Sequence, residues 1–139
     1  MDNAYFILDN AFYKNYIDLY YMMDYIKSTV IFLVLDSIYL STTSGHFNKV
    51  VKSIQGSEIK FNMSAAVACY IILAFAINYF IIKDKRPVLD AFLLGFVIYA
   101  VFDLTNMAIF KKWDLMTSLM DMTWGGVLFA STTYLTYKL

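Results

Sequence analysis

The sequence predicts an all-α integral membrane protein, a four-helix bundle inside a lipid bilayer. Its composition is 60% hydrophobic and only 16% charged, and the mean hydropathy is +0.58, whereas a soluble domain carries about a quarter charged residues. Four long apolar stretches each approach the roughly 20 residues that a helix needs to cross the hydrocarbon core. Because these runs lack the alternation of a barrel strand and lipid offers the backbone no hydrogen-bond partner, helices are the expected form.

The four expected spans are separated by short polar connections. The second span contains no charged residue, and the turns around Lys83–Pro87 and Lys111–Asp114 are charged. Pro87 suits the first turn of a helix, and Trp113 suits the membrane interface. We therefore place the spans at about residues 25–43, 61–82, 88–110 and 115–137.

Two amphipathic segments are expected beside the first span. Residues 1–24 are acidic but carry apolar residues at steps of three and four, which predicts an amphipathic helix on the membrane surface or against a partner. Between the first two spans, an apolar stripe predicts a short interfacial helix, formed by Phe47, Val50, Val51 and Ile54. The expected organisation is an N-terminal extension, 1–24, followed by a membrane domain, 25–139.

Three aspartates lie inside the expected spans. Asp36 and Asp103 each lie seven residues before the end of a span, and Asp121 lies six residues after the start of one. At 1.5 Å per residue, all three carboxyl groups are about 10 Å inside the same membrane surface. Each costs roughly 2.5–3.5 kcal/mol on insertion scales, so such residues usually face the bundle interior and often carry function.

Helical spacing gives these aspartates polar neighbours. We expect a polar intramembrane cluster consisting of Asp36, Asp103, Thr105, Asn106, Thr117, Asp121 and Trp124. No Lys or Arg lies at that depth. Three ionised carboxylates would repel one another, so either one of them is protonated or a cation lies among them. The pattern does not identify a metal.

The third and fourth spans resemble a known family. The residues that carry the resemblance are Gly95, Tyr99-Ala100, Asp103-Leu104-Thr105-Asn106, Trp113, Asp121 and Trp124-Gly125, with Leu35-Asp36 and Tyr39-Leu40 in the first span. These motifs resemble those of the bacterial membrane family catalogued as domain of unknown function 2177, over roughly Met23 to Tyr134. The resemblance implies a four-helix membrane protein whose characteristic residues include these aspartates. It implies no activity.

Two functions remain open. The protein either transports protons or a cation through the aspartate cluster, or it is a structural subunit of a larger membrane assembly or viral membrane, with the aspartates as interhelical hydrogen-bond glue. No catalytic motif is present, so neither an enzyme nor a cofactor is expected. Equal numbers of basic and acidic residues, 11 each, argue against nucleic-acid binding.

The expected partners are the lipid bilayer and either further copies of the chain or a larger membrane complex. One cysteine, Cys69, excludes an internal disulfide. A multi-pass chain with four spans has both termini on one side. Six basic residues on that side against five on the other favour cytoplasmic termini.

Overall fold

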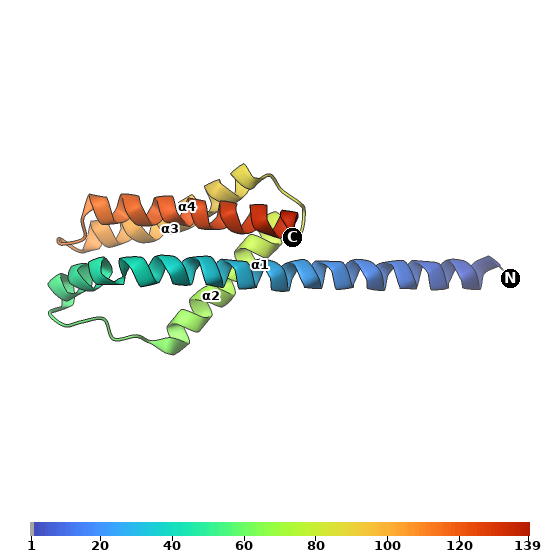
Figure 1. Cartoon of the computed structure of the whole chain (residues 1–139), viewed down its shortest axis with the longest axis horizontal. Helices are drawn as coiled ribbons and strands as arrows, with labels where there is room; N and C mark the ends of the chain where they lie inside the picture. The colour runs from blue at the N-terminus through green and yellow to red at the C-terminus, as the bar shows by residue number, and fades with distance from the viewer. Residues whose placement is uncertain (1) are drawn as a thin grey trace.

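The computed structural model describes the backbone of residues 2–139 and the side chains of Phe12 and of residues 14–139. This part of the chain contains four α-helices and no strand (Figure 1). They are α1 (Asp2–Gln55), α2 (Met63–Ile77), α3 (Val88–Ile109) and α4 (Leu115–Lys138), and α2 continues into a π-helical turn, η1 (Asn78–Ile82). The predicted all-α, four-helix class is confirmed.

The division of the first helix needs correction. The expected N-terminal helix, first span and interfacial helix form one continuous helix, α1, of 54 residues. Nothing in this segment forces a break, because it contains no proline and its single glycine, Gly45, is accommodated within the helix. The helix ends where Gly56 takes a positive φ of 76°, a common helix terminus. The domain boundary at Asp24 stays a prediction, since the helix crosses it unbroken.

Hydroxyl groups explain how α1 passes through its polar stretch. Five of them bond back to carbonyl oxygens one turn earlier, those of Ser37, Ser41, Thr42, Thr43 and Ser44. Such bonds satisfy the hydroxyls inside a membrane and tend to bend a helix. Figure 1 accordingly shows the last turns of α1 tilted from the axis of the rest.

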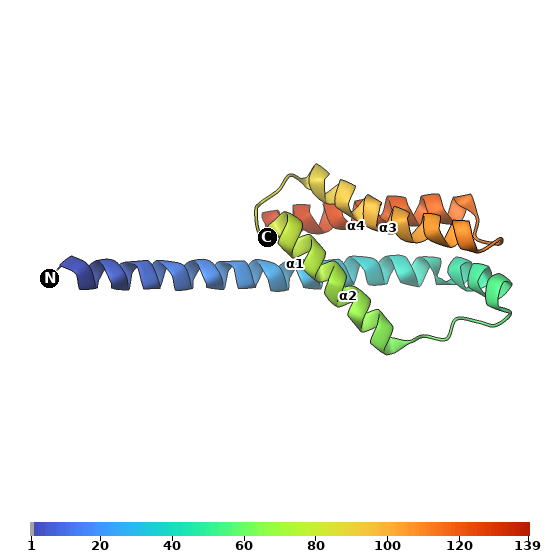
Figure 2. The ribbon, with the colours of Figure 1, turned by 180° about the vertical axis from the view of Figure 1, so that it is seen from behind.

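Only part of α1 belongs to the bundle. Its C-terminal part runs beside α4, and its N-terminal part projects well beyond the other helices (Figures 1 and 2). The projecting part carries exposed apolar side chains, including Phe12, Tyr16 and Leu19.

The closest helix pair is α3 and α4. A methyl group added at Gly95 would overlap the Gly125 carbonyl, and one added at Gly126 would overlap the Phe92 ring. Small residues let helices approach closely in lipid, where dispersion replaces the hydrophobic effect as the main attraction. The two helices are therefore antiparallel neighbours along their length (Figure 1).

Helix α2 crosses the bundle obliquely. Asn62 caps its start by accepting a hydrogen bond from the Ala65 amide. In η1 the Lys83 amide bonds to the Asn78 carbonyl, the five-residue step of a π-helix. The core below it contains Phe32, Ile77 and Phe129, all at most 1% exposed.

In the part of the chain that the structure describes, three helical stretches are long and apolar enough to cross a membrane: Lys14–Gln55 within α1, Met63–Ile82, and Val88–Ile109. The fourth expected span, α4, has the length but more polar residues. Those residues are buried against neighbours: Thr117, Ser118, Asp121, Thr132, Thr133 and Thr136. These buried polar residues lower the hydropathy of α4, and the fourth span stays a prediction.

Candidate functional site

Asp36 joins three helices. This carboxyl group on α1 is 5% exposed. Its Oδ1 accepts a hydrogen bond from Trp124 Nε1 of α4 at 3.0 Å, and its Oδ2 accepts one from the Tyr70 hydroxyl of α2 at 2.6 Å. Both donors are neutral side chains.

Asp121 of α4 lies close to this first group. Its Oδ1 accepts a hydrogen bond from the Tyr39 hydroxyl at 3.0 Å. The Tyr39 ring stacks on the Trp124 ring, with centroids 4.4 Å apart and planes within 8°. Asp36 and Asp121 are therefore linked through one stacked aromatic pair.

Asp103 of α3 is completely buried. Its Oδ1 accepts a hydrogen bond from Trp113 Nε1 at 3.2 Å. Its Oδ2 has no hydrogen-bond donor among the described residues. The Asp103 and Asp121 side chains lie near enough to influence each other's charge. A buried acceptor normally has a hydrogen-bond partner, so the unpartnered Oδ2 is unusual.

Positive charge is absent from this network in the described part of the chain. The ion pairs there lie elsewhere: Lys27–Asp24, Lys85–Asp24, Lys52–Glu58 and Arg86–Asp90. Over the same residues, no three His, Cys, Asp or Glu side chains come together as a metal site. Asp36, Asp103 and Asp121 thus receive neutral donors alone from the residues described.

The expected cluster is only partly assembled. Asp36, Asp103, Asp121 and Trp124 belong to the network. Thr105 is exposed and Asn106 half-buried, and neither side chain has a hydrogen bond to a described residue. At 3.6 residues per turn, a residue two positions after Asp103 points roughly 200° away from it.

Thr117 is buried but belongs to a different group. The Thr117 hydroxyl donates to Asp114 Oδ2 at 2.8 Å. His46 Nε2 lies 2.8 Å from the Thr117 hydroxyl oxygen. Because the hydroxyl has one proton and gives it to Asp114, His46 Nε2 is the donor to Thr117. Hydrogen bonds from the Thr117 amide and hydroxyl lower the pKa of Asp114.

Several of these partners were not predicted. Trp113 was expected only as an interfacial residue, and nothing in the sequence pattern pointed to His46. Tyr39 follows Asp36 by three residues on α1 but donates to Asp121. Its three-residue spacing from Asp36 was a usable signal. No sequence signal pointed to Tyr70, because its position depends on how α2 crosses α1.

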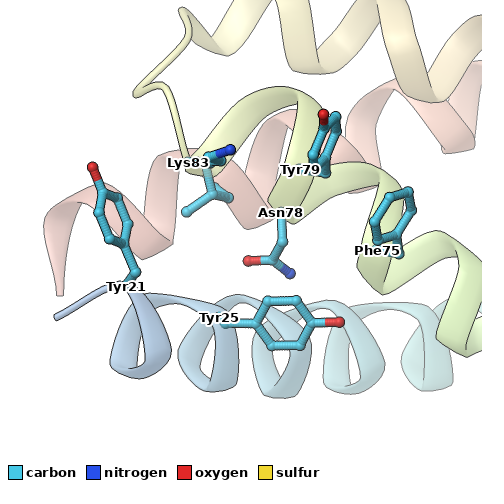
Figure 3. Close-up of a pocket in the computed structure, with 7 residues that line it drawn as sticks. Tyr21, Tyr25, Phe75, Asn78, Tyr79 and Lys83 are labelled. Atoms are coloured by element: carbon cyan, nitrogen blue, oxygen red, sulfur yellow. The ribbon is translucent and has the colours of Figure 1, made fainter. Parts of the chain in front are cut away.

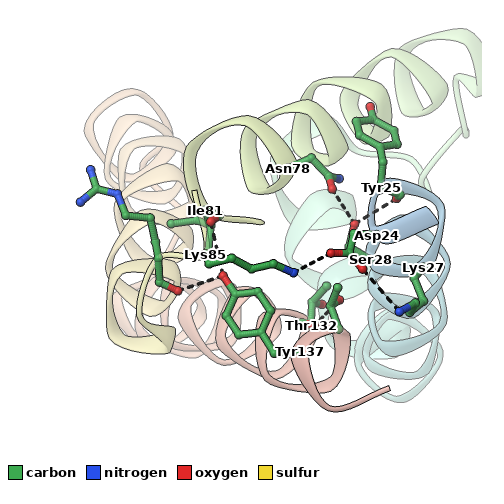
Figure 4. Close-up of polar contacts among 11 residues, drawn as sticks. Asp24, Tyr25, Lys27, Ser28, Asn78, Ile81, Lys85, Thr132 and Tyr137 are labelled. Carbon is green, nitrogen blue, oxygen red and sulfur yellow. Dashed lines mark hydrogen bonds and ion pairs between the residues drawn. The ribbon is translucent and has the colours of Figure 1, made fainter. Parts of the chain in front are cut away.

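The opposite end of the bundle holds a different carboxylate site. Asp24 is 2% exposed and contacts Lys85 Nζ at 2.6 Å and Lys27 Nζ at 3.4 Å. Figure 4 shows Lys85 reaching across to Asp24 beside Tyr137, whose hydroxyl donates to the Arg86 carbonyl at 2.9 Å. Burial opposes the charge of Lys85, but the Asp24 hydrogen bond and charge outweigh it and raise the pKa of Lys85.

Several apolar cavities border α2 and η1, and two of them bear on the sites described above. One, of about 290 Å³, lies between α1 and α2, with Tyr21 and Lys83 at one end and Phe75 toward the other; Asn78 points from η1 into this space (Figure 3). The Ser28 hydroxyl donates to Asn78 there at 2.7 Å. The other cavity, of about 630 Å³, lies between α2 and α3 and has Asp121 in its wall.

Comparison with known proteins identifies a family. A family model described as "Predicted membrane protein (DUF2177)" matches residues 21–138. This agrees with the resemblance seen over Met23 to Tyr134. Neither a curated protein nor a solved structure matches the chain.

Proposed function

The chain belongs to the DUF2177 family of predicted membrane proteins, and from that premise we propose that its aspartates bind and transfer protons within the bilayer. The observation that carries this proposal is the buried Asp103 Oδ2, which has no donor among the described residues; the Asp121 carboxyl group lies near this side chain. A proton shared by the two carboxyl groups would give that oxygen its missing partner.

Charge supports the same conclusion. Ionised carboxylates are strongly disfavoured in a low-dielectric interior unless they are paired. Asp36, Asp103 and Asp121 have no cationic partner among the described residues. Holding one proton reduces both the repulsion among them and the cost of burial.

A route to water begins one helical turn from Asp121. Thr117 precedes it by four residues on α4 and is hydrogen-bonded to His46 and Asp114. Both of these side chains are exposed. We infer that His46 passes protons between solvent and the Asp103–Asp121 pair, since an imidazole ring can accept a proton on one nitrogen and donate one from the other.

A cation is the less favoured cargo. A metal ion in a membrane site needs several oxygen ligands around it. The described residues contain no group of three acidic, His or Cys side chains of that kind. Protons need only a hydrogen-bonded pair.

A structural role in a larger assembly has support of its own. The projecting part of α1 exposes Phe12, Tyr16 and Leu19, which are 77%, 65% and 51% exposed. In that role, a neighbouring helix covers this stripe and the aspartate network ties α1, α2 and α4 together.

Proton flux into liposomes separates the two functions. The wild-type protein should admit protons down a pH gradient, detected with an enclosed pH-sensitive dye. Asp103→Asn should fold, because its amide oxygen can still accept from Trp113, but its flux should fall at least tenfold. Asp90→Asn removes an exposed carboxylate of the same helix and should leave flux unchanged. Absence of flux in the wild type under every gradient would remove the proton proposal and leave the structural one.

A further inference from the structure

The cavity between α2 and α3 has the size of a ligand site. Its volume of about 630 Å³ falls within the roughly 300–1,000 Å³ typical of small-molecule pockets. The wall is almost wholly apolar and includes Ala68, Cys69 and Ile72 of α2 and Ile98 and Phe102 of α3. Asp121 of α4 is the charged residue among those that line the cavity.

The cavity exists because α2 leans away from α3. Helix α3 packs on α4 through its glycines, whereas α2 packs on α1 and is joined to η1. Figure 2 shows α2 diverging from α3 along its length. Ile72 and Phe102 beside the gap are 65% and 57% exposed, so the opening faces the region that lipid would occupy.

Electrostatics decides which head group fits. Asp121 is more than nine-tenths buried and lies near two further carboxyl groups, Asp36 and Asp103. No Lys, Arg or His is among the residues that line the cavity. An anionic head group would be repelled, and a neutral one would gain little, whereas a cationic donor would gain a charge-assisted hydrogen bond.

We propose that this cavity binds a lipophilic amine, with its ammonium group against Asp121 and its apolar body between α2 and α3. This inference rests on the proposed proton site. As the ammonium ion binds, the proton shared by Asp103 and Asp121 leaves to water, so one positive charge replaces another. The protein then exchanges a hydrophobic cation for a proton.

Cys69 provides a direct test, because it lines the cavity, is exposed and is the chain's one cysteine. In lipid nanodiscs, a small maleimide should alkylate it at a measurable rate. Dodecylammonium should slow that rate at least fivefold, whereas dodecanol and dodecanoate, with the same chain and other head groups, should not.

Variants locate the effect. Asp121→Asn should abolish the protection by dodecylammonium, and Asp90→Asn, with the same loss of charge on the outside of α3, should retain it. Ala68→Phe leaves every aspartate in place but fills the cavity, so it should also remove the protection. Ala68→Phe keeps the test informative if Asp121→Asn does not fold.

Three results would overturn the inference. Equal protection by all three probes would indicate a general lipid groove. Protection that survives both Asp121→Asn and Ala68→Phe would place the amine elsewhere. No protection at any concentration would exclude amine binding. The proton site is tested separately, because its flux and its protonated carboxyl group are measured without any amine.

Discussion

Two buried carboxylate sites lie at different places in the bundle and differ in how their charge is compensated. Asp24 is paired with Lys85 and Lys27. Asp103 and Asp121 have Trp and Tyr donors and each other. Both sites are almost inaccessible. Burial alone therefore does not distinguish a structural carboxylate from one that changes protonation.

We therefore expect the two sites to have different roles. The Asp24 site fastens the turn between η1 and α3 to α1, and Tyr137 fastens the same turn to α4 (Figure 4). The charge of the Asp24 carboxylate is balanced by a lysine 2.6 Å away. The Asp103–Asp121 pair has no such cation among the described residues, and under our proposal a shared proton takes its place.

The largest effect on stability should come from breaking the compensated site. Asp24→Ala leaves Lys85 without its partner and should lower the free energy of unfolding by about 1.5–3 kcal/mol, the range for hydrogen bonds to charged groups. The lower part of the range applies because Lys85 is 44% exposed. Reversible unfolding in mixed micelles measures it.

A matched control is Asp90→Ala, which breaks the exposed pair with Arg86. Its effect should stay below about 1 kcal/mol. Equal losses for the two variants would contradict the idea that Asp24 is a structural clamp.

A smaller effect is expected at the uncompensated site. Tyr39→Phe removes the donor to Asp121 but keeps the ring stacked on Trp124. Hydrogen bonds between membrane helices are worth about 0.6 kcal/mol on average and at most about 1.7, so the unfolding free energy should fall by that amount. A loss as large as that of Asp24→Ala would show that the network mainly holds the helices together.

The smallest effect should appear at alkaline pH. The pKa of Lys85 is raised in the folded protein, so its stabilisation is complete below the unfolded value of about 10.4 and is lost as pH rises through the higher folded value. Unfolding followed from pH 9 upward should show this loss in the wild type. Asp24→Asn should remove most of it, and an unchanged pH dependence in that variant would contradict the pairing.

The sequence predicted the helices better than their continuity. Four long apolar runs led directly to the four-helix class, since only helices and closed barrels satisfy the backbone in lipid and these runs lack the alternation of barrel strands. The polar stretch from Ser41 to Gly45 suggested a boundary, but its hydroxyls bond back to the helix and α1 continues. Composition alone cannot distinguish hydroxyls that end a helix from hydroxyls that only bend it.

The site was predictable to the extent that it depends on depth along a helix. Counting residues brought Asp36, Asp103 and Asp121 to one level. Which donor meets which carboxyl group depends on the crossing of α1, α2 and α4. Tyr70 reaches Asp36 from α2. No local sequence pattern predicts the angle at which α2 crosses α1.

Under our proposal, Asp103 and Asp121 share one proton. Infrared spectroscopy of the protein in lipid at neutral pH tests it directly, through the carbonyl stretch of a protonated carboxyl group and its shift in heavy water. The band should be present in the wild type and in Asp90→Asn, and absent from both Asp103→Asn and Asp121→Asn. A wild-type spectrum without this band would show that all the carboxyl groups are ionised and would contradict the account.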